Sequence, residues 1–156
     1  MTETSDTAQA IVRPPLAWGL AIVIGLALDW LAPLPFVPAG VPAAGLGAGV
    51  FLLALALFAW AVMTMTRAGT NVPGNRPATT IVANGPYRFT RNPIYVGMFL
   101  SIAGLAIAFD TSWLLLTLVA FALVVRYGVV AREEAYLERK FGDVYRDYRR
   151  RVRRWI

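Results

Sequence analysis

The chain contains no cysteine and no histidine. Without cysteine it can form no disulfide, no thiolate nucleophile and no thiolate metal ligand. Without histidine it lacks the residue that most often serves as a general base near neutral pH and most often binds transition metals. Catalysis by a Ser-His-Asp or Cys-His arrangement is therefore excluded, and the sequence predicts no metal site.

Charged residues are also scarce, since Asp, Glu, Lys and Arg make up only 15% of the 156 residues. A soluble domain is about a quarter charged and about half apolar, whereas this chain is 58% hydrophobic and has a mean hydropathy of +0.57. This composition predicts an integral membrane protein with one domain, residues 1–156. Residues 1–13 lack the basic start and cleavage site of a signal peptide and are expected to form a short polar tail.

Four apolar segments are long enough, or nearly so, to cross a bilayer as helices. They are residues 16–31, 43–65, 94–109 and 113–130. A perpendicular span needs roughly 20 residues, so the first and third are expected to extend into their flanks or to lie partly inside the bundle. Only a short turn separates the third segment from the fourth. The sequence thus predicts an all-α membrane protein with about four transmembrane helices, the last two forming a tight hairpin.

Positive charge gathers on one side of these predicted spans. The loop 66–93 carries four arginines and no acid, and the tail 132–156 carries more basic than acidic residues. The two other connections contain no Lys or Arg. Because positively charged loops remain in the cytoplasm, we expect an inner, cytoplasmic membrane location with both termini and the long loop on the cytoplasmic side.

The tail 132–156 has apolar residues at spacings of three or four, with arginines between them. This pattern predicts an amphipathic cytoplasmic helix, with Gly142 as a site for a kink, that lies against anionic membrane lipids. The basic residues are therefore assigned to membrane lipids and not to a nucleic acid.

The stretch "GPYRFTRNPIYVG", residues 85–97, combines turn residues with a helix start. Asn92 is a suitable N-cap and Pro93 a suitable first residue for the third helix. The free N–H groups of such a start bind anions, for instance a carboxylate. The segment adds side chains with positive charge or an aromatic hydroxyl: Tyr87, Arg88, Arg91 and Tyr95. The alternative is that these side chains simply mark the membrane boundary, where arginine and tyrosine are common.

Two adjacent acids, Glu133 and Glu134, directly follow the fourth apolar segment. Acids at a membrane boundary are costly unless paired. One can pair with Arg126 two turns earlier, one can receive a ligand ammonium, or both can lie on a solvated helix start. The hairpin brings them close to the start of the third helix. The two sites together suit a zwitterion, with its carboxylate toward Arg91 and Asn92 and its ammonium toward either glutamate.

These motifs in combination resemble a known family. "GPYRFTRNPIYVG", a hydrophobic hairpin and "EEAYLERKFGDVYRDYRRRVRRWI" resemble the isoprenylcysteine carboxyl methyltransferase family, which is related to the integral-membrane phospholipid methyltransferases. The resemblance covers roughly residues 66–156 and reaches the first two spans only in hydropathy. It implies an S-adenosyl-L-methionine-dependent methyltransferase whose cofactor binds at the cytoplasmic face, with 66–93 as the cofactor loop.

The resemblance also implies residue roles. The adenosine part of the cofactor is expected on the backbone of Gly85, Pro86 and Tyr87. Its amino-acid end is expected on Arg91, Asn92, Pro93 and Tyr95, with Glu133 or Glu134 taking the ammonium. The residues expected to act in catalysis or to close the site are Glu133, Glu134, Tyr145, Tyr148 and Arg149. The family usually has histidine where this chain has Asn92. Asparagine donates hydrogen bonds but cannot carry a proton charge, so prenylcysteine is not carried over as the substrate.

The sequence therefore predicts an enzyme that methylates a lipophilic or small-molecule acceptor at the membrane. Because only Glu133, Glu134 and tyrosines remain as candidate bases, an acceptor that is already anionic or easily deprotonated is favoured. The alternative is a non-catalytic membrane protein that binds lipid or assists assembly. The acceptor, the oligomeric state and the glutamate that binds the ammonium stay open.

Overall fold

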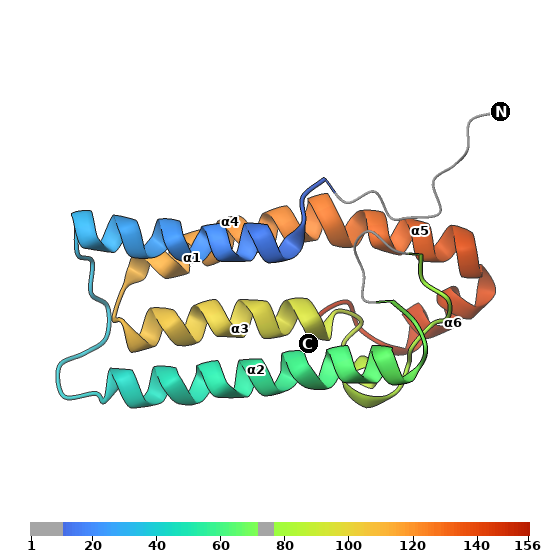
Figure 1. Ribbon diagram of the computed structural model, residues 1–156, viewed down its shortest axis with the longest axis horizontal. Helices are drawn as coiled ribbons and strands as arrows, with labels where there is room; N and C mark the ends of the chain where they lie inside the picture. Colours follow the sequence, from blue (N-terminus) through green and yellow to red (C-terminus); the bar gives the residue numbers. More distant parts are fainter. Residues whose placement is uncertain (1–10, 72–76) are drawn as a thin grey trace.

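The computed structural model describes residues 11–71 and 77–156, and all regular secondary structure within these ranges is helical (Figure 1). Four long helices lie side by side: α1 (Pro14–Leu31), α2 (Ala43–Arg67), α3 (Pro93–Ala108) and α4 (Ser112–Val124). By length and composition α1, α2 and the continuous helical stretch Ser112–Phe141 can cross a membrane, while α3 is shorter, with 16 residues. The predicted all-helical architecture is confirmed for the described residues, with three helices long and apolar enough to cross a membrane and one shorter apolar helix.

The turn between α3 and α4 is as tight as predicted. Asp110 adopts a positive φ of 50°, and the Thr111 hydroxyl accepts a hydrogen bond from the Trp113 amide at 3.2 Å, which caps α4. The Asp110 carboxylate also accepts the backbone N–H groups of Phe36 and Val37 at 2.8 and 2.6 Å. The α1–α2 loop is thereby tied to the hairpin at this end of the bundle.

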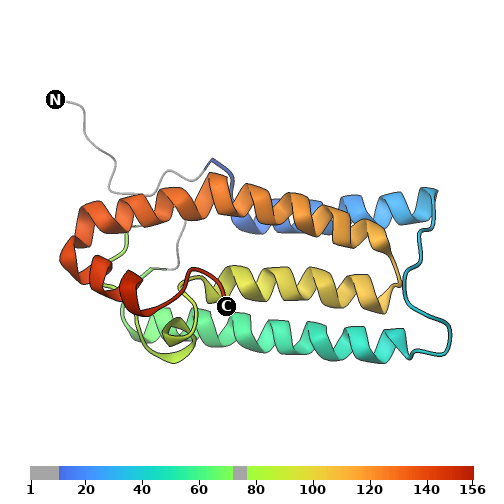
Figure 2. The same cartoon turned by 180° about the vertical axis from the view of Figure 1, so that it is seen from behind.

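Helix α3 lies between α2 and α4 (Figures 1 and 2). Its contact with α2 is close because glycines remove side chains from the interface. A Cβ added to Gly104 would lie 2.7 Å from the Phe51 nitrogen, and one added to Gly47 would lie 2.2 Å from the Ala108 nitrogen. Backbone-to-backbone packing of this kind holds the end of α3 firmly against the first part of α2.

A π-helical segment, Val125–Val130, joins α4 to α5 (Ala131–Phe141). A π-helical turn contains one more residue than an α-helical turn. The residues after it are therefore rotated about the helix axis relative to an uninterrupted α-helix. This rotation sets the direction of Glu133 and Glu134.

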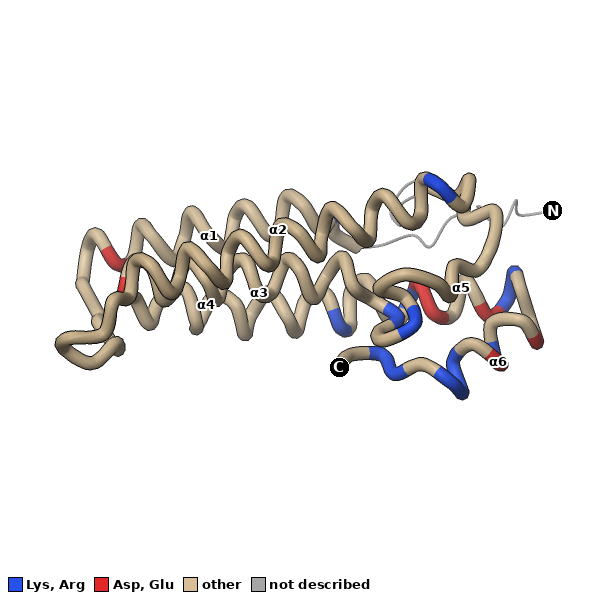
Figure 3. The backbone as a smooth tube through the Cα atoms, turned by 90° about the horizontal axis from the view of Figure 1, so that it is seen from below, with Lys and Arg blue, Asp and Glu red and all other residues tan. Residues whose placement is uncertain are grey.

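The predicted helix over 132–156 is divided into two in the structure, because the helix breaks at Gly142, the expected site of a kink. Gly142, with a φ of 53°, separates α5 from α6 (Asp143–Arg151), and the chain becomes extended at Val152. A positive φ is readily adopted by glycine, which explains the break. The last residues return to the start of α3, at the end of the molecule where Lys and Arg gather (Figure 3). Residues 1–10 of the predicted polar tail and Arg76 of the loop lie outside the described residues.

Candidate functional site

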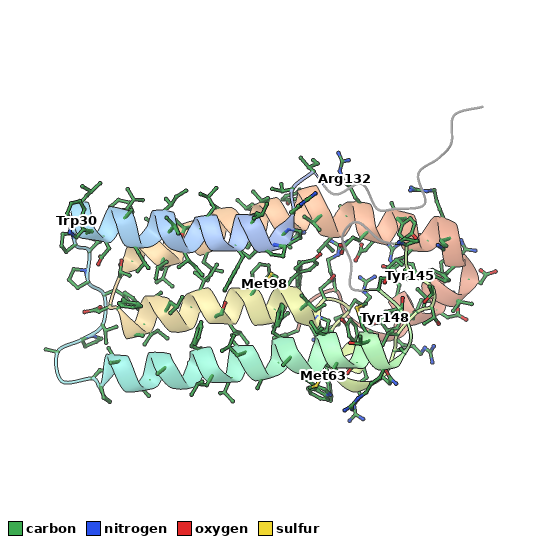
Figure 4. All side chains as sticks on the ribbon, viewed as in Figure 1. Trp30, Met63, Met98, Arg132, Tyr145 and Tyr148 are labelled. Atoms are coloured by element: carbon green, nitrogen blue, oxygen red, sulfur yellow. The ribbon has the colours of Figure 1, made fainter. Side chains whose placement is uncertain are left out.

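A cavity of about 150 Å³ lies at the charged end of the bundle, where α3 begins. Helices α1, α2, α3, α5 and α6 and the loop before α3 all contribute to its wall. One part of the wall is apolar, with Phe58, Met65, Ile94 and Met98. The other part is polar and holds the two glutamates, Arg91 and several tyrosines. Figure 4 shows Tyr145 and Tyr148 at this end of the bundle, with Met98 on α3 nearer its middle.

Glu133 is buried, with 6% of its surface exposed. Its carboxylate accepts a hydrogen bond from the Tyr95 hydroxyl at 2.8 Å, and no cation pairs with it among the described residues. The alternative pairing with Arg126 is wrong, since no ion pair joins Arg126 to either glutamate in the described part of the chain, and the Arg126 guanidinium lies 5.4 Å from the centre of the Tyr127 ring. Residues seven apart share a face of an α-helix, but the π-helical segment between them removes that alignment.

Glu134 is also buried, at 9% exposed, but its carboxylate is fully paired. Arg154 donates to both of its oxygens, from Nε at 2.9 Å and from Nη2 at 2.6 Å. Arg91 Nη2 lies 3.2 Å from the same carboxylate. The hydrogen bond to Glu134 raises the pKa of Arg154 above its usual value, so the guanidinium of Arg154 stays charged. The two glutamates therefore differ: one is matched by two cations and the other by none. Neither lies on a solvated helix start.

Two buried donors at the cavity have no acceptor among the described residues: the Tyr87 hydroxyl and Arg91 Nε. The remaining Arg91 nitrogens contact Glu134 and the Tyr145 hydroxyl, the latter at 3.3 Å. An unsatisfied buried donor costs about 1–3 kcal/mol. A ligand that brings an acceptor to these two groups would recover that free energy.

Tyr87, Tyr145 and Tyr148 stay protonated at neutral pH. Burial raises the pKa of Tyr145 to about 12, with a further contribution from the nearby Glu134. Burial likewise raises the pKa of Tyr148 and of Tyr87 well above the usual range. The Tyr148 hydroxyl donates to the Tyr87 carbonyl at 2.8 Å. These hydroxyls can therefore donate hydrogen bonds but do not act as bases.

Asn92 occupies the N-cap position of α3, as predicted, but its side chain does not cap the helix. Its Nδ2 instead donates to the Arg154 carbonyl at 2.9 Å. The Asn92 backbone N–H donates to the Thr90 hydroxyl at 3.2 Å. The side-chain amide is thus engaged by the C-terminal segment.

Residues 42–144 match the phospholipid methyltransferase family. The chain belongs to this family. The match runs from the start of α2 into α6 and includes most of the cavity wall. The resemblance drawn from residues 85–97 and the C-terminal segment is confirmed, and membership implies a membrane methyltransferase.

Two relatives of this phospholipid methyltransferase family member share parts of its sequence. An uncharacterized protein of Haemophilus influenzae is 45% identical over 63 residues, which are 40% of this chain and 100% of that protein. The nickel-cobalt-cadmium resistance protein NccN of Alcaligenes xylosoxydans xylosoxydans is 37% identical over 77 residues, which are 49% of this chain and 36% of NccN. The chain thus covers only about a third of the length of NccN. No solved structure matches.

Most of the predicted site residues of this phospholipid methyltransferase family member meet at the cavity. Those that line it are Tyr87, Arg91, Asn92, Pro93, Tyr95, Glu133, Glu134, Tyr145 and Tyr148. Gly85 and Pro86 lie outside the lining and begin a 3₁₀ turn, Gly85–Arg88, that packs on α2. Arg149 also lies outside it, half exposed, and donates to Glu138 at 3.1 Å.

Sequence reasoning missed Arg154 and Tyr136. Arg154 stands in a run of arginines in which nothing distinguishes the one that turns inward. Tyr136 lines the cavity, and its hydroxyl accepts the Ala78 amide at 3.2 Å. Nothing in the sequence around Tyr136 indicated that its side chain would face the cavity.

Proposed function

We propose that the chain is an S-adenosyl-L-methionine-dependent methyltransferase that acts at the membrane on a lipophilic or small-molecule acceptor. One observation carries this proposal. The cavity contains a buried carboxylate, Glu133, that no described cation pairs with, and two buried donors, on Arg91 and Tyr87, that no described residue accepts from. A zwitterionic amino-acid group satisfies all three. Family membership supplies the reaction class, and S-adenosyl-L-methionine is a methyl donor with such a group.

In this proposal Glu133 binds the ammonium of the cofactor. Glu134 is the weaker candidate because its carboxylate is already matched by Arg91 and Arg154. Arg91 Nε and the Tyr87 hydroxyl bind the carboxylate. The apolar part of the wall, which includes Val82 and Met98, suits the adenosine ring or the acceptor. Gly85 and Pro86 do not line the cavity, and they belong to the same 3₁₀ turn as Tyr87, whose position that turn sets.

Bound in this cavity, S-adenosyl-L-methionine would supply an activated methyl group, carried on a sulfonium sulfur, to a lone pair of the acceptor. The protein contributes mainly alignment and exclusion of water to a reaction of this kind. Tyr87, Tyr145 and Tyr148 stay protonated, Glu133 would bind the ammonium, and Glu134 is paired with arginines, so no carboxylate of the described cavity wall remains free to act as a base. We therefore propose an acceptor whose lone pair is available at neutral pH, such as a carboxylate.

The charge distribution supports a topology for this enzyme. The basic residues of the α2 end, α5, α6 and the C-terminal segment all lie at one end of the bundle (Figure 3). We propose that this end faces the cytoplasm, with both termini there and with α3 as the fourth, short span of an inner-membrane protein. The soluble cofactor would then reach the cavity from the cytoplasm and the acceptor from the bilayer.

Calorimetric titration of the detergent-purified protein with S-adenosylhomocysteine tests the proposal. Micromolar binding is expected, because S-adenosylhomocysteine keeps the zwitterionic end and the adenosine. Homocysteine alone, which lacks the adenosine, should bind far more weakly. A folded protein that does not bind S-adenosylhomocysteine would instead favour a lipid-binding or assembly role.

A further inference from the structure

Residues 152–156, called here the C-terminal clasp, pair with the segment that precedes α3. The Arg91 amide donates to the Arg153 carbonyl at 2.9 Å. The Thr90 hydroxyl and Asn92 Nδ2 donate to the Arg154 carbonyl at 3.1 and 2.9 Å. The clasp therefore holds the backbone on either side of Arg91 through hydrogen bonds that are remote in sequence.

The same clasp reaches the opposite side of the cavity through one side chain. Arg154 binds both oxygens of Glu134 on α5. Beside it, the Trp155 ring packs on Phe99 with ring centroids 5.5 Å apart. All clasp residues are described, and none of them lines the cavity. Any effect of the clasp on a ligand must therefore pass through the lining residues that it contacts, which include Arg91, Asn92 and Glu134.

The position of Arg91 depends on how Glu134 is satisfied. With Arg154 holding both carboxylate oxygens, Arg91 makes a single 3.2 Å contact to Glu134 and keeps its Nε–H without a protein acceptor. If Arg154 were neutral, Arg91 would be the only cation pairing with this buried carboxylate among the described residues. A lone guanidinium binds a carboxylate most favourably through two parallel N–H groups. Arg91 would then turn toward Glu134 and withdraw its free donor from the cavity.

We propose that Arg154 is a positioning residue, which holds Glu134 so that Arg91 remains free to bind the carboxylate of the ligand. This inference rests on the proposed function for the identity of the ligand. It does not make Arg154 a catalytic residue, because its guanidinium does not line the cavity.

The test compares Arg154→Gln with Arg153→Gln, which removes the same charge from the neighbouring, exposed side chain of the clasp. Two ligands are titrated: S-adenosylhomocysteine, and its decarboxylated analogue, which keeps the ammonium but lacks the carboxylate. Arg154→Gln should weaken binding of the first about ten-fold and leave binding of the second unchanged. Arg154→Lys, which keeps the charge but not the paired donors, should fall between. Arg153→Gln should bind both ligands as the wild type does.

Hydrogen exchange of the Arg91 amide provides a readout that needs no ligand. The amide should exchange about ten-fold faster in Arg154→Gln than in Arg153→Gln, because the clasp opens more often. Equal exchange rates in the two variants, or an equal loss of affinity for both ligands, would overturn the proposal. If the wild type binds neither ligand, the proposed function fails, and the exchange rates still decide whether Arg154 holds the clasp.

Discussion

Replacing Glu133 with glutamine should weaken ligand binding without destabilising the protein. The substitution keeps the shape of the side chain and removes its charge. Glutamine Oε1 can still accept the Tyr95 hydroxyl, which donates to Glu133 at 2.8 Å. The main change is therefore the loss of one buried negative charge that no described cation balances.

The expected changes in affinity and stability follow from the burial of Glu133. Loss of one partner of a buried charge pair costs about 2 kcal/mol or more in binding, or about 30-fold in Kd. Desolvation of an unpaired buried carboxylate costs several kcal/mol, while the hydrogen bond to a neutral acceptor is weaker by about 1 kcal/mol. The ligand-free Glu133→Gln protein should therefore be as stable as the wild type at pH 8, or more stable.

The assay combines calorimetric titration with S-adenosylhomocysteine and thermal unfolding in detergent. Glu138→Gln is the matched control, because Glu138 lies on the same helix but pairs with Arg149 on the outer surface. Its affinity should equal that of the wild type. If Glu133→Gln bound S-adenosylhomocysteine as tightly as the wild type, the assignment of the ammonium to Glu133 would be refuted. A variant that lost affinity and stability together would point to a structural role instead.

Two further predictions concern packing and pH. Gly104→Ala should destabilise the protein by about 1–3 kcal/mol, because the new Cβ meets the Phe51 backbone. Gly49→Ala, with nothing within 4 Å of its Cβ, should leave the stability unchanged. Thermal unfolding in detergent compares the two variants, and equal unfolding midpoints would contradict close α2–α3 packing. Since burial raises the pKa of Tyr145 to about 12, from about 10 when unfolded, the unfolded state loses this proton first and stability should fall as pH rises between these values. Tyr145→Phe should show a smaller fall in denaturant titrations across that range, and an identical fall would argue against burial of this hydroxyl.

The helices and the hairpin could be predicted because hydropathy and local signals determine them. Long apolar runs gave the helices, and the turn around Thr111 gave the hairpin and its cap. The meeting of residues 85–97 with Glu133 and Glu134 followed from that hairpin. The helices and the turn are local structures, and the two helices of a hairpin must lie side by side, so sequence patterns are informative for these features.

Other features depend on contacts or distortions that the sequence pattern does not reveal. The seven-residue spacing placed Arg126 and Glu133 on one face, but the π-helical segment rotates them apart. The return of the chain after Arg151 depends on hydrogen bonds to residues about 60 positions earlier. The pattern of arginines between apolar residues continues to Arg154, although α6 ends at Arg151. Arg154 was therefore not distinguishable from its neighbours.

The most direct test of the central claim locates the methyl donor on the protein. S-adenosyl-L-methionine labelled in its methyl group would be cross-linked to the detergent-purified chain by ultraviolet light, and the labelled peptides sequenced. The account predicts label in residues 85–97 or 133–148, and its loss in the presence of excess S-adenosylhomocysteine. Label confined to other segments, or label that S-adenosylhomocysteine does not displace, would contradict a methyl-donor site in this cavity.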